Sequence, residues 1–364
     1  MSSQQKLRVL FLTRYPVDGA SSRYRVHQYI PHLEQMGVSC TVQSFMDPQM
    51  YRLSFTVGGV PRKLWATGKA VLRRVAAVAR HREYDVVYMQ RALLPFGPPW
   101  LERWMQRRGT KLCFDYDDAL FIKKPSRFNP LATLFRAPGK VLELFGLVDR
   151  VVAGNDWLRD QAAQHGADAV TLEVAEDVSR MPAPGSRVGG GPMTIGWLGS
   201  TSTVKYLHLI APALREIAGR YPDVRFELMG GGDFHMDGVD WHHQPWSLEG
   251  EVEALGRFDI GLMPLPMEEW ARGKSGGKAR TYMAAGVVPV CAAIGYNLEL
   301  IEHGRTGFLC SSHEEWVAAL ELLIRESTLR KQVAVAARAE VEQRFDPRGQ
   351  AEKLRDVLVS LAGG

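Results

Sequence analysis

Residues 272–290 read Arg-Gly-Lys-Ser-Gly-Gly-Lys-Ala-Arg-Thr-Tyr-Met-Ala-Ala-Gly-Val-Val-Pro-Val, a Gly-rich turn followed by a helix-forming run and a short apolar run. Helix formers extend from Lys278 to Ala285, and Gly286 is a typical C-terminal stop. The first amides of such a helix point outward, and Lys274 and Lys278 lie beside them. Amides and ammonium groups together suit a diphosphate. The alternative is a capped surface helix with solvated lysines.

The same stretch disfavours two common classes of nucleotide-binding protein. Its glycines and lysines do not have the Gly-x4-Gly-Lys-Ser/Thr spacing of a phosphate-binding loop. No Gly-x-Gly-x-x-Gly follows the first strand-like run of the chain. Kinase-like proteins and dinucleotide-dependent dehydrogenases therefore lose support.

Around this stretch, short β-branched runs alternate with segments of helical period, the pattern of an α/β fold with parallel sheets. Residues 181–192 interrupt the alternation, because seven of these twelve residues are Gly or Pro, and they are expected to form a linker. We therefore predict an N-terminal domain at residues 1–180 and a C-terminal domain at residues 193–346. Strands are expected at residues 9–13, 40–45, 85–89, 112–116, 151–153, 170–174, 194–198, 225–229, 259–263, 288–291 and 307–310.

Length and composition limit the class of protein further. The 364 residues suffice for two domains, and 46% hydrophobic with 23% charged residues is typical of a folded globular chain. No apolar run approaches the roughly 20 residues that cross a bilayer, and the polar start lacks a signal peptide, so a cytoplasmic protein is expected. The four cysteines have no close pair and are expected to be free thiols. A net charge of +5 favours anionic partners.

Two groups of polar residues are candidates for a site in the N-terminal domain. Asp115, Asp117 and Asp118 lie at the end of a predicted strand, where carboxylates contact sugar hydroxyls, stabilise a turn or hold a divalent metal. Residues 19–23 lie at a helix start near the carboxyl end of the first strand, where open α/β sheets bind ligands. Simple capping of that helix is the alternative, and Pro31 should kink it.

Residues 61–83 are rich in Arg and Lys interleaved with apolar residues, the composition of a basic amphipathic helix that lies on a membrane surface. The alternative is a helix that packs its apolar side on the core and exposes a basic rim. The first interpretation would suit a lipid acceptor and peripheral contact with the inner membrane face. The apolar residues concerned are Leu64, Trp65, Val71, Leu72, Val75 and Val78.

Several segments resemble glycosyltransferase family 4, in the same order along nearly the whole chain. The pattern Lys278-x-x-Thr281-Tyr-Met-Ala-Ala-Gly286-x-x-Pro289-Val290 looks like the donor-site helix of that family. The other similar segments are residues 8–14 with 21–30, 114–121, 195–199 and 228–232. Their shared order makes the resemblance more specific than any one of these motifs.

The resemblance implies a GT-B fold, in which two Rossmann-like domains face each other across a cleft, with the acceptor mostly on the first and the nucleotide sugar mostly on the second. It implies that residues 347–364 form a helix that returns to the first domain. It also implies transfer with retention of anomeric configuration, with no metal or other cofactor and with the nucleotide sugar as co-substrate. Amides and lysines would stabilise the charge of the departing diphosphate.

The residue patterns and the resemblance together assign three groups of site residues. The catalytic group is Asp117, Asp118 and Lys278. The donor-binding group is Gly199, Lys205, Gly230, Trp246, Lys274, Ser275, Gly276, Gly277 and Thr281. The acceptor-side group is Gly19, Ser21, Ser22 and Arg23. No metal ligand is assigned.

Two features of the donor side leave alternatives open. Family 4 usually has two glutamates separated by seven residues, the second of which binds the ribose, and alignment puts Gly273 and Thr281 at these positions. A threonine offers one hydroxyl where a carboxylate accepts two hydrogen bonds. Glu268 and Glu269 could substitute if the register of the loop differs. The aromatic and histidine side chains of residues 241–246 could stack on a base or pack at a strand end.

Three functions are therefore in competition. The first is a retaining hexosyl- or N-acetylhexosaminyltransferase with a glycan, lipid or small-molecule acceptor. The second is a non-catalytic protein of the same fold that binds a sugar nucleotide or a glycan, which the missing glutamates motivate. The third is a basic nucleic-acid-binding protein, which would need charge clustered outside the cleft and is not expected.

Overall fold

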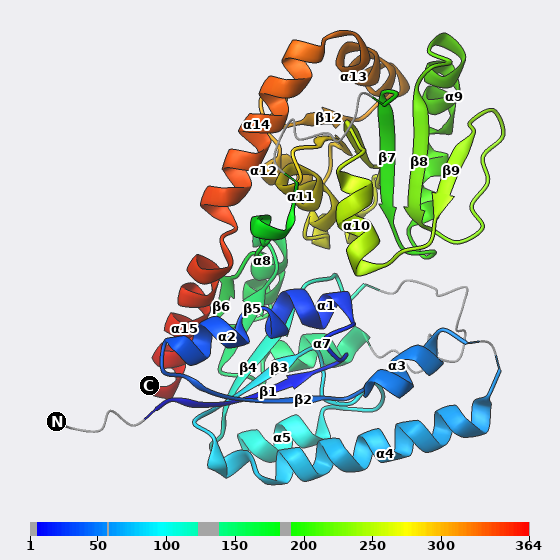
Figure 1. Cartoon of the computed structure of the whole chain (residues 1–364). Coiled ribbons are helices and arrows are strands. Elements are labelled where there is room, and N and C mark those ends of the chain that lie inside the picture. Colours follow the sequence, from blue (N-terminus) through cyan, green and yellow to red (C-terminus); the bar gives the residue numbers. More distant parts are fainter. Residues whose placement is uncertain (1–5, 57, 123–137, 183–190, 364) are drawn as a thin grey trace. The chain divides into compact units, whose positions relative to one another are not determined.

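The computed structural model describes residues 6–56, 58–122, 138–182 and 191–363, and Figure 1 gives the element labels used below. The chain divides into two compact units, residues 1–175 with 347–364, and residues 176–346. Most of the expected linker, residues 183–190, lies outside the described residues.

The N-terminal unit is built on a parallel sheet whose six described strands have the order β2-β1-β3-β4-β5-β6. The runs predicted as strands are these strands, with small shifts of their ends. Their residues are mostly apolar because a parallel sheet is covered on both faces. The strands are β1 (Arg8–Thr13), β2 (Ser39–Ser44), β3 (Val86–Gln90), β4 (Lys111–Tyr116), β5 (Arg150–Ala153) and β6 (Ala169–Thr171).

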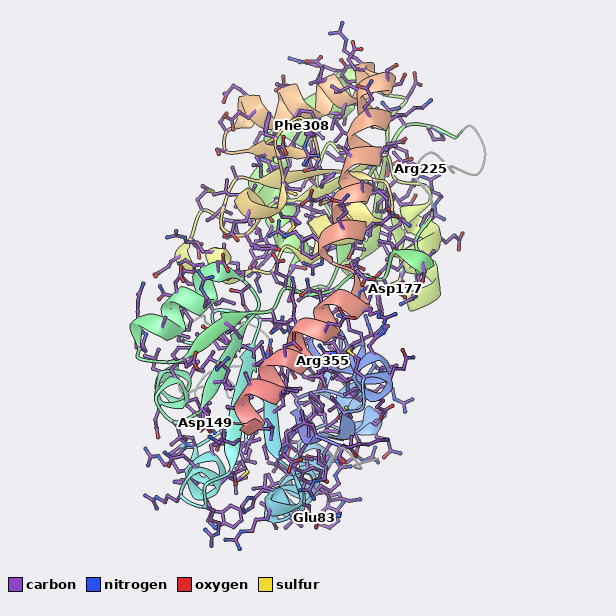
Figure 2. The ribbon with its side chains drawn as sticks, turned by 90° about the vertical axis from the view of Figure 1, so that its left-hand side faces the viewer. Glu83, Asp149, Asp177, Arg225, Phe308 and Arg355 are labelled. Atoms are coloured by element: carbon purple, nitrogen blue, oxygen red, sulfur yellow. The ribbon has the colours of Figure 1, made fainter. Side chains whose placement is uncertain are left out.

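Helices from both ends of the chain cover this sheet. The last helix, α15, packs against α2, and Leu354 and Leu358 of α15 join the core formed by β1 and β3. Figure 2 labels Arg355 on this helix. The helical segments of the unit are α1 (Ala20–Ser22), η1 (Arg23–His27), α2 (Ile30–Gln35), α3 (Pro48–Ser54), α4 (Val60–Ala79), η2 (His81–Glu83), α5 (Trp100–Gln106), α7 (Pro138–Phe145), α8 (Asp156–Gln164) and α15 (Pro347–Gly363).

Pro31 breaks the helix that follows β1, as the sequence predicts. Residues 23–27 form a turn of π-helix, and α2 starts at Ile30 with Pro31 in its first turn. A proline has no N–H to donate to the preceding turn, so a regular helix cannot run through this position. The three short segments therefore take the place of one long helix.

The orientation of α4 agrees with a core-facing helix for Val71 and Val78 but not for the other four apolar residues of the predicted segment. Its buried side chains are those of Ala70, Arg74 and Val78. The side chains of Leu64, Trp65, Leu72 and Val75 are instead exposed to solvent. A core-facing apolar side with a basic rim is therefore wrong for these four residues. Within the described residues, no helix has both the length and the apolar content needed to cross a bilayer.

The C-terminal unit has a second parallel sheet, with its six described strands in the order β12-β11-β10-β7-β8-β9. Strand β9 was not predicted, since it is a polar edge strand with two exposed histidines. Its strands are β7 (Thr194–Gly199), β8 (Arg225–Gly230), β9 (Trp241–Gln244), β10 (Ile260–Met263), β11 (Val288–Ala292) and β12 (Phe308–Cys310). Its helical segments are η3 (Val178–Arg180), η4 (Val204–Ile210), α9 (Ala211–Arg220), α10 (Leu248–Leu255), η5 (Glu269–Gly273), α11 (Gly277–Ala284), α12 (Asn297–Leu300), α13 (His313–Arg325) and α14 (Ser327–Arg344).

Glycines in two central strands make room for aromatic rings. A Cβ atom added to Gly196 of β7 would lie 2.1 Å from Cδ2 of Phe258. A Cβ added to Gly261 of β10 would lie 2.4 Å from Cγ of Tyr282. Because protein interiors are close-packed, neither ring can move aside without disturbing its neighbours. These glycines let α11 and the turn before β10 lie directly on the sheet.

We expect Gly196→Ala to lower the free energy of unfolding by about 2 kcal/mol or more, since overpacking a core strains side chains and backbone. Urea unfolding followed by circular dichroism measures the change. Gly219→Ala, in α9 with open space around the added methyl group, is the matched control and should raise stability by about 0.4–1 kcal/mol. Equal stability of the two variants would contradict this packing.

Candidate functional site

Each sheet has a point where the winding of the chain reverses. In the N-terminal unit the point lies between β1 and β3, and in the C-terminal unit it lies between β7 and β10. Open α/β sheets bind ligands outside the carboxyl ends of the strands at such a point, because the loops there diverge and leave a crevice. The strand order therefore marks one candidate place in each unit.

A cavity of about 150 Å³ lies at this point of the C-terminal unit. The end of β7, segment η4, the loop after β10 and the start of α11 contribute its walls. No acidic residue is among the described residues that line it. The lining residues are Trp197, Thr203, Tyr206, Met263, Pro264, Leu265, Lys274, Ser275, Gly276, Gly277 and Lys278. Five of the six predicted site residues of the Gly-rich stretch and its helix thus line one cavity: Lys274, Ser275, Gly276, Gly277 and Lys278.

The amino end of α11 forms one wall of this cavity. The helix starts at Gly277, one residue before the predicted start, and Gly276 is its N-cap with φ of 64°. A Cβ atom at Gly276 would lie 2.8 Å from Cδ1 of Tyr296, so both the backbone conformation and the space require glycine there. The first N–H groups of a helix have no partner within it. They are available to an anion in the cavity.

Two lysines supply positive charge at the same wall. The Lys278 ammonium lies 5.4 Å from the centre of the Trp197 ring, and that of Lys274 lies 5.7 Å from the centre of the Trp270 ring. Burial, together with the positive charge of Lys274, lowers the pKa of Lys278 to about 8. Among the described residues, no carboxylate forms an ion pair with Lys278. The protein therefore holds two like charges close together, an arrangement that a bound anion would stabilise.

Two predicted glycines shape the floor of this region. A Cβ atom at Gly199, the last residue of β7, would lie 2.7 Å from Cε of Lys278. A Cβ at Gly230, the last residue of β8, would lie 2.1 Å from the carbonyl oxygen of Gly199. Any larger residue at position 199 would displace the Lys278 side chain. Gly199 thus leaves space for this lysine, whereas Gly230 leaves space for the backbone of Gly199.

Two other predicted donor residues do not line this cavity. Lys205 is exposed, and its ammonium lies 5.5 Å from the centre of the Tyr206 ring. Trp246 is partly exposed, and its Nε1 donates to Oε2 of Glu251 at 2.6 Å. Their roles as donor contacts stay predictions.

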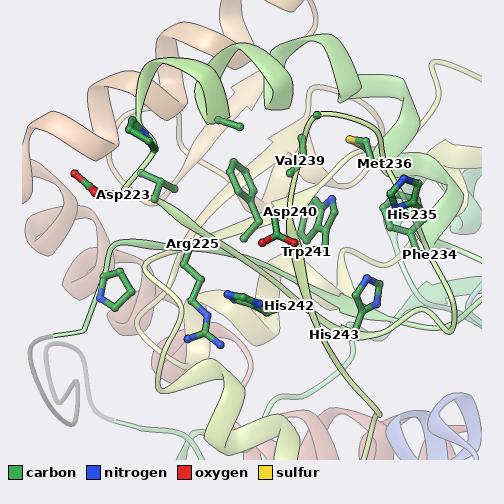
Figure 3. A pocket seen from close by; sticks show the side chains of 16 residues that line it. Asp223, Arg225, Phe234, His235, Met236, Val239, Asp240, Trp241, His242 and His243 are labelled. Carbon is green, nitrogen blue, oxygen red and sulfur yellow. The ribbon is translucent and has the colours of Figure 1, made fainter.

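A larger cavity of this unit, about 930 Å³, lies elsewhere, along β8, β9 and the loop between them (Figure 3). Trp241 is buried there against Phe226, with ring centres 5.5 Å apart, whereas His242 and His243 are exposed. None of these three residues lines the cavity that contains the lysines. The arrangement of Trp241 favours strand packing over stacking on a base.

Thr281 has a carboxylate partner, Glu176, which lies far from it in the sequence. The Thr281 hydroxyl donates to Oε2 of Glu176 at 3.1 Å, and Nε of Arg280 lies 3.7 Å from the same oxygen. Burial raises the pKa of Glu176 to about 7, even though Arg280 and Thr281 act to lower it. Glu268, proposed as a substitute, instead accepts a hydrogen bond from Trp270. Glu176 and Thr281 are 105 positions apart, so no local pattern in the sequence indicates their hydrogen bond.

The corresponding point of the N-terminal unit holds a network around Asp117. The Ser21 hydroxyl donates to Oδ2 of Asp117 at 3.0 Å, and Nη2 of Arg91 lies 3.3 Å from Oδ1. Gln90 donates to the Ser21 hydroxyl at 2.9 Å. Burial alone would raise the pKa of Asp117, but Arg91, Arg25 and Ser21 hold it below its ordinary value. The carboxylate is therefore ionised and fixed in position at neutral pH.

The other predicted acceptor-side residues shape the loop. The Ser22 hydroxyl donates to Oε1 of Gln90 at 2.7 Å and accepts from the Tyr15 amide at 3.0 Å. A Cβ atom at Gly19 would lie 2.3 Å from Cβ of Tyr15. Arg23 donates to the backbone of residues 17 and 18. Of these residues, Ser21 is the one that contacts Asp117.

Two of the three aspartates at the end of β4, Asp115 and Asp117, have protein cations as partners. Nε of Arg25 donates to Oδ1 of the buried Asp115 at 3.1 Å, and Arg91 pairs with Asp117. Oδ1 of Asp118 accepts from the Ala119 amide at 3.1 Å. In the part of the chain that the structure describes, no group of three or more His, Cys, Asp or Glu side chains has an arrangement that would hold a metal.

The sequence analysis did not predict Arg91 as a site residue, although its position in the chain could have indicated it. It directly follows β3, at the carboxyl end of a strand beside the reversal point. It also has φ of 68°, which is unusual for a residue other than glycine and is maintained by its surroundings. Such strained residues cluster at functional sites. Trp197 and Tyr206, which line the cavity with the lysines, were not predicted as site residues either, although Trp197 lies within the similar segment 195–199.

One comparison with known proteins concerns the C-terminal unit. Residues 192–326 match the family model described as Glycosyl transferases group 1. Over 87 residues the chain is 36% identical to human alpha-1,3/1,6-mannosyltransferase ALG2, a match that covers 21% of this chain and 21% of that protein. The chain thus spans about a fifth of the length of this relative.

Solved structures show the same fold over nearly the whole chain. The structure of Anabaena Alr3699/HepE in complex with UDP-glucose has a TM-score of 0.71 at 17% identity, and covers 97% of this chain and 100% of that one. Sucrose-phosphate synthase from Thermosynechococcus elongatus has a TM-score of 0.71 at 13% identity, with 98% and 100% covered. The predicted α/β GT-B fold is confirmed, and residues 192–326 have the pattern of group 1 glycosyl transferases.

The buried Glu176 should make stability depend on pH. Its pKa is higher in the folded chain, about 7, than the ordinary value of 4.5, so the folded state binds the extra proton between these values. The free energy of unfolding should then fall by roughly 3 kcal/mol as pH rises from 4.5 through 7. Urea unfolding of wild type and Glu176→Gln at several pH values isolates this contribution, since the variant lacks the titrating group. Parallel pH profiles for the two proteins would contradict the assignment.

Proposed function

We propose that this chain is a retaining glycosyltransferase that moves a sugar from a nucleotide diphosphate sugar to a glycan, lipid or small-molecule acceptor, without a bound metal. The observation that carries the proposal is the cavity in which Lys274 and Lys278 meet the amino end of α11. Two facts support it: the glycosyltransferase family pattern spans these residues, and a protein of the same fold is solved with UDP-glucose.

In this proposal the diphosphate of the donor occupies the cavity. The amides of residues 275–277 and of Lys278 donate to its oxygens, and the two ammonium groups balance its charge. Gly199 and Gly230 keep the floor free of side chains, so that Lys278 can reach the phosphates. Thr281, Lys205 and Trp246 are proposed to contact the rest of the nucleotide.

The reaction needs charge stabilisation more than acid–base catalysis. The acceptor oxygen forms a bond to the anomeric carbon on the face from which the diphosphate leaves, as the carbon–oxygen bond to the diphosphate breaks. The bonding electrons go to the phosphate oxygen, and a phosphate oxygen takes the proton of the acceptor. Lys278 and the α11 amides stabilise the negative charge that develops, and preorganised donors are most effective at such a place.

Asp117 and Asp118 are proposed to bind sugar hydroxyls, together with the acceptor-side residues 19–23. Arg91 and Ser21 hold the Asp117 carboxylate in one orientation. An ionised carboxylate that is fixed in this way accepts hydrogen bonds without paying for its own ordering. Arg91 is therefore proposed as a positioning residue of this site.

The non-catalytic alternative is favoured by one observation, the presence of Gly273 and Thr281 at positions that usually carry glutamates. Isothermal titration with a panel of nucleotide sugars, followed by a donor-hydrolysis assay, separates the two functions. Binding with hydrolysis or transfer supports the enzyme. Tight binding without turnover for every donor and acceptor tested would support the alternative.

We expect Lys278→Ala to lower turnover by roughly 10²-fold, the scale on which one preorganised anion-stabilising donor acts. Lys331→Ala, which removes an exposed lysine of α14 in the same unit, is the matched control and should leave turnover unchanged. Initial rates at saturating donor measure the effect. A folded Lys278→Ala variant with wild-type turnover would remove Lys278 from the mechanism.

Binding of a diphosphate should weaken at alkaline pH. Because the pKa of Lys278 is about 8, its charge is lost above that pH, and the affinity should fall by up to about tenfold per pH unit. Calorimetric titration with inorganic pyrophosphate between pH 7 and 9.5 tests this. The probe carries no nucleoside, so the test does not depend on which nucleotide the protein binds. The Lys278→Ala variant should bind more weakly and vary less with pH. Identical pH profiles would show that Lys278 does not contact the anion.

A further inference from the structure

The outward side of α4 is apolar, which is unusual for a helix at the surface of a globular unit. Trp65 is 72% exposed, Leu72 is 71% exposed and Leu64 is 67% exposed. Val75 is exposed as well. In Figure 1 this helix runs along the lower margin of the N-terminal unit. Contiguous exposed apolar side chains of this size mark an interaction surface.

Helix geometry places these residues on one face and basic residues beside them. Trp65 and Leu72 are seven positions apart and therefore lie on the same side of the helix, opposite Ala70 and Arg74, which are buried. Arg62, Lys69 and Arg73 are separated by seven and four positions and therefore lie along one flank of this side. We call residues 62, 64, 65, 69, 72 and 75 the α4 face.

The charge of this helix has one sign. Residues 60–79 include five Arg and Lys and no Asp or Glu. Arg73 pairs with Asp47 at 3.0 Å, whereas Arg62 and Lys69 form no ion pair with any residue that the structure describes. Both are exposed. The α4 face therefore presents free positive charge next to its apolar centre.

A second exposed apolar site lies at the amino end of the same helix. Phe55 follows α3 and is 72% exposed, and Val60 is the first residue of α4 and is also exposed. Lys63 donates to the Thr56 carbonyl oxygen at 2.6 Å, which ties the end of α3 to the start of α4. Exposed apolar side chains thus also occur near this end of α4.

From this arrangement we infer that the α4 face docks the N-terminal unit on an anionic lipid bilayer, with the helix axis parallel to the surface. Trp65 and Leu72 enter the boundary between headgroups and acyl chains, while Arg62 and Lys69 remain among the lipid phosphates. A nucleic acid would offer phosphates but no place for the apolar centre. An anionic bilayer surface offers both.

Docking would bring a membrane-held acceptor to the N-terminal unit, and this consequence rests on the proposed function. The docking itself does not, because the α4 face shares no residue with the cavity or with the network around Asp117. Lipid binding and sugar transfer can therefore be lost separately.

Co-sedimentation of the full chain with vesicles tests the inference. Vesicles of phosphatidylcholine with 30% phosphatidylglycerol should bind the wild type, and binding should weaken as NaCl is raised from 50 to 500 mM. Trp65→Ser with Leu72→Ser should lower the affinity at least about tenfold. Arg62→Gln with Lys69→Gln should lower it by about tenfold or more at low salt.

The matched control is Leu322→Ser with Val335→Ser, which removes two exposed apolar side chains from the C-terminal unit and should leave vesicle binding unchanged. Donor hydrolysis in the absence of vesicles should be the same in all variants, so a failure of docking is distinguished from a failure of the proposed function.

Two results would overturn the inference. One is equal binding to vesicles with and without phosphatidylglycerol, or no binding to either. The other is self-association of the wild type in light scattering that Trp65→Ser with Leu72→Ser abolishes, with no binding to vesicles. The α4 face would then be an interface between copies of this chain.

Discussion

The site depends on two ammonium groups held close together at the amino end of a buried helix, in a cavity that no described carboxylate lines. Burial, and after it the positive charge of Lys274, disfavours the charged form of Lys278 and lowers its pKa to about 8. A diphosphate would stabilise that charged form, because its charge is opposite and its oxygens accept from the helix amides. In the structure the Lys278 ammonium lies over the Trp197 ring, and the Lys274 ammonium lies over the Trp270 ring.

The rest of the C-terminal unit maintains this geometry. Gly276 gives the turn before α11 its left-handed conformation, and Gly199 leaves space for the Lys278 side chain. The reversal of strand order between β7 and β10 opens the crevice. The N-terminal unit follows the same rule with different chemistry, since its reversal point presents a fixed carboxylate, Asp117, held by Arg91. One sheet topology thus supplies a cationic and an anionic site.

Local patterns in the sequence predict the fold and the cavity well, because both depend on short-range chemistry. A Gly-rich turn, a helix and a glycine stop lie within residues 272–286, and the structure has α11 there. Predictions fail where burial is decided by distant contacts. The Glu176–Thr281 hydrogen bond, the role of Arg91 and the outward side of α4 all depend on what the folded chain places beside them. Strand β9 was missed because an edge strand can be polar.

A crystal structure of the protein with UDP would test the central claim most directly. We expect diphosphate oxygens within hydrogen-bonding distance of the Lys278 ammonium and of the first amides of α11. Density for the diphosphate at another place, with Lys278 still lying over the Trp197 ring, would contradict it.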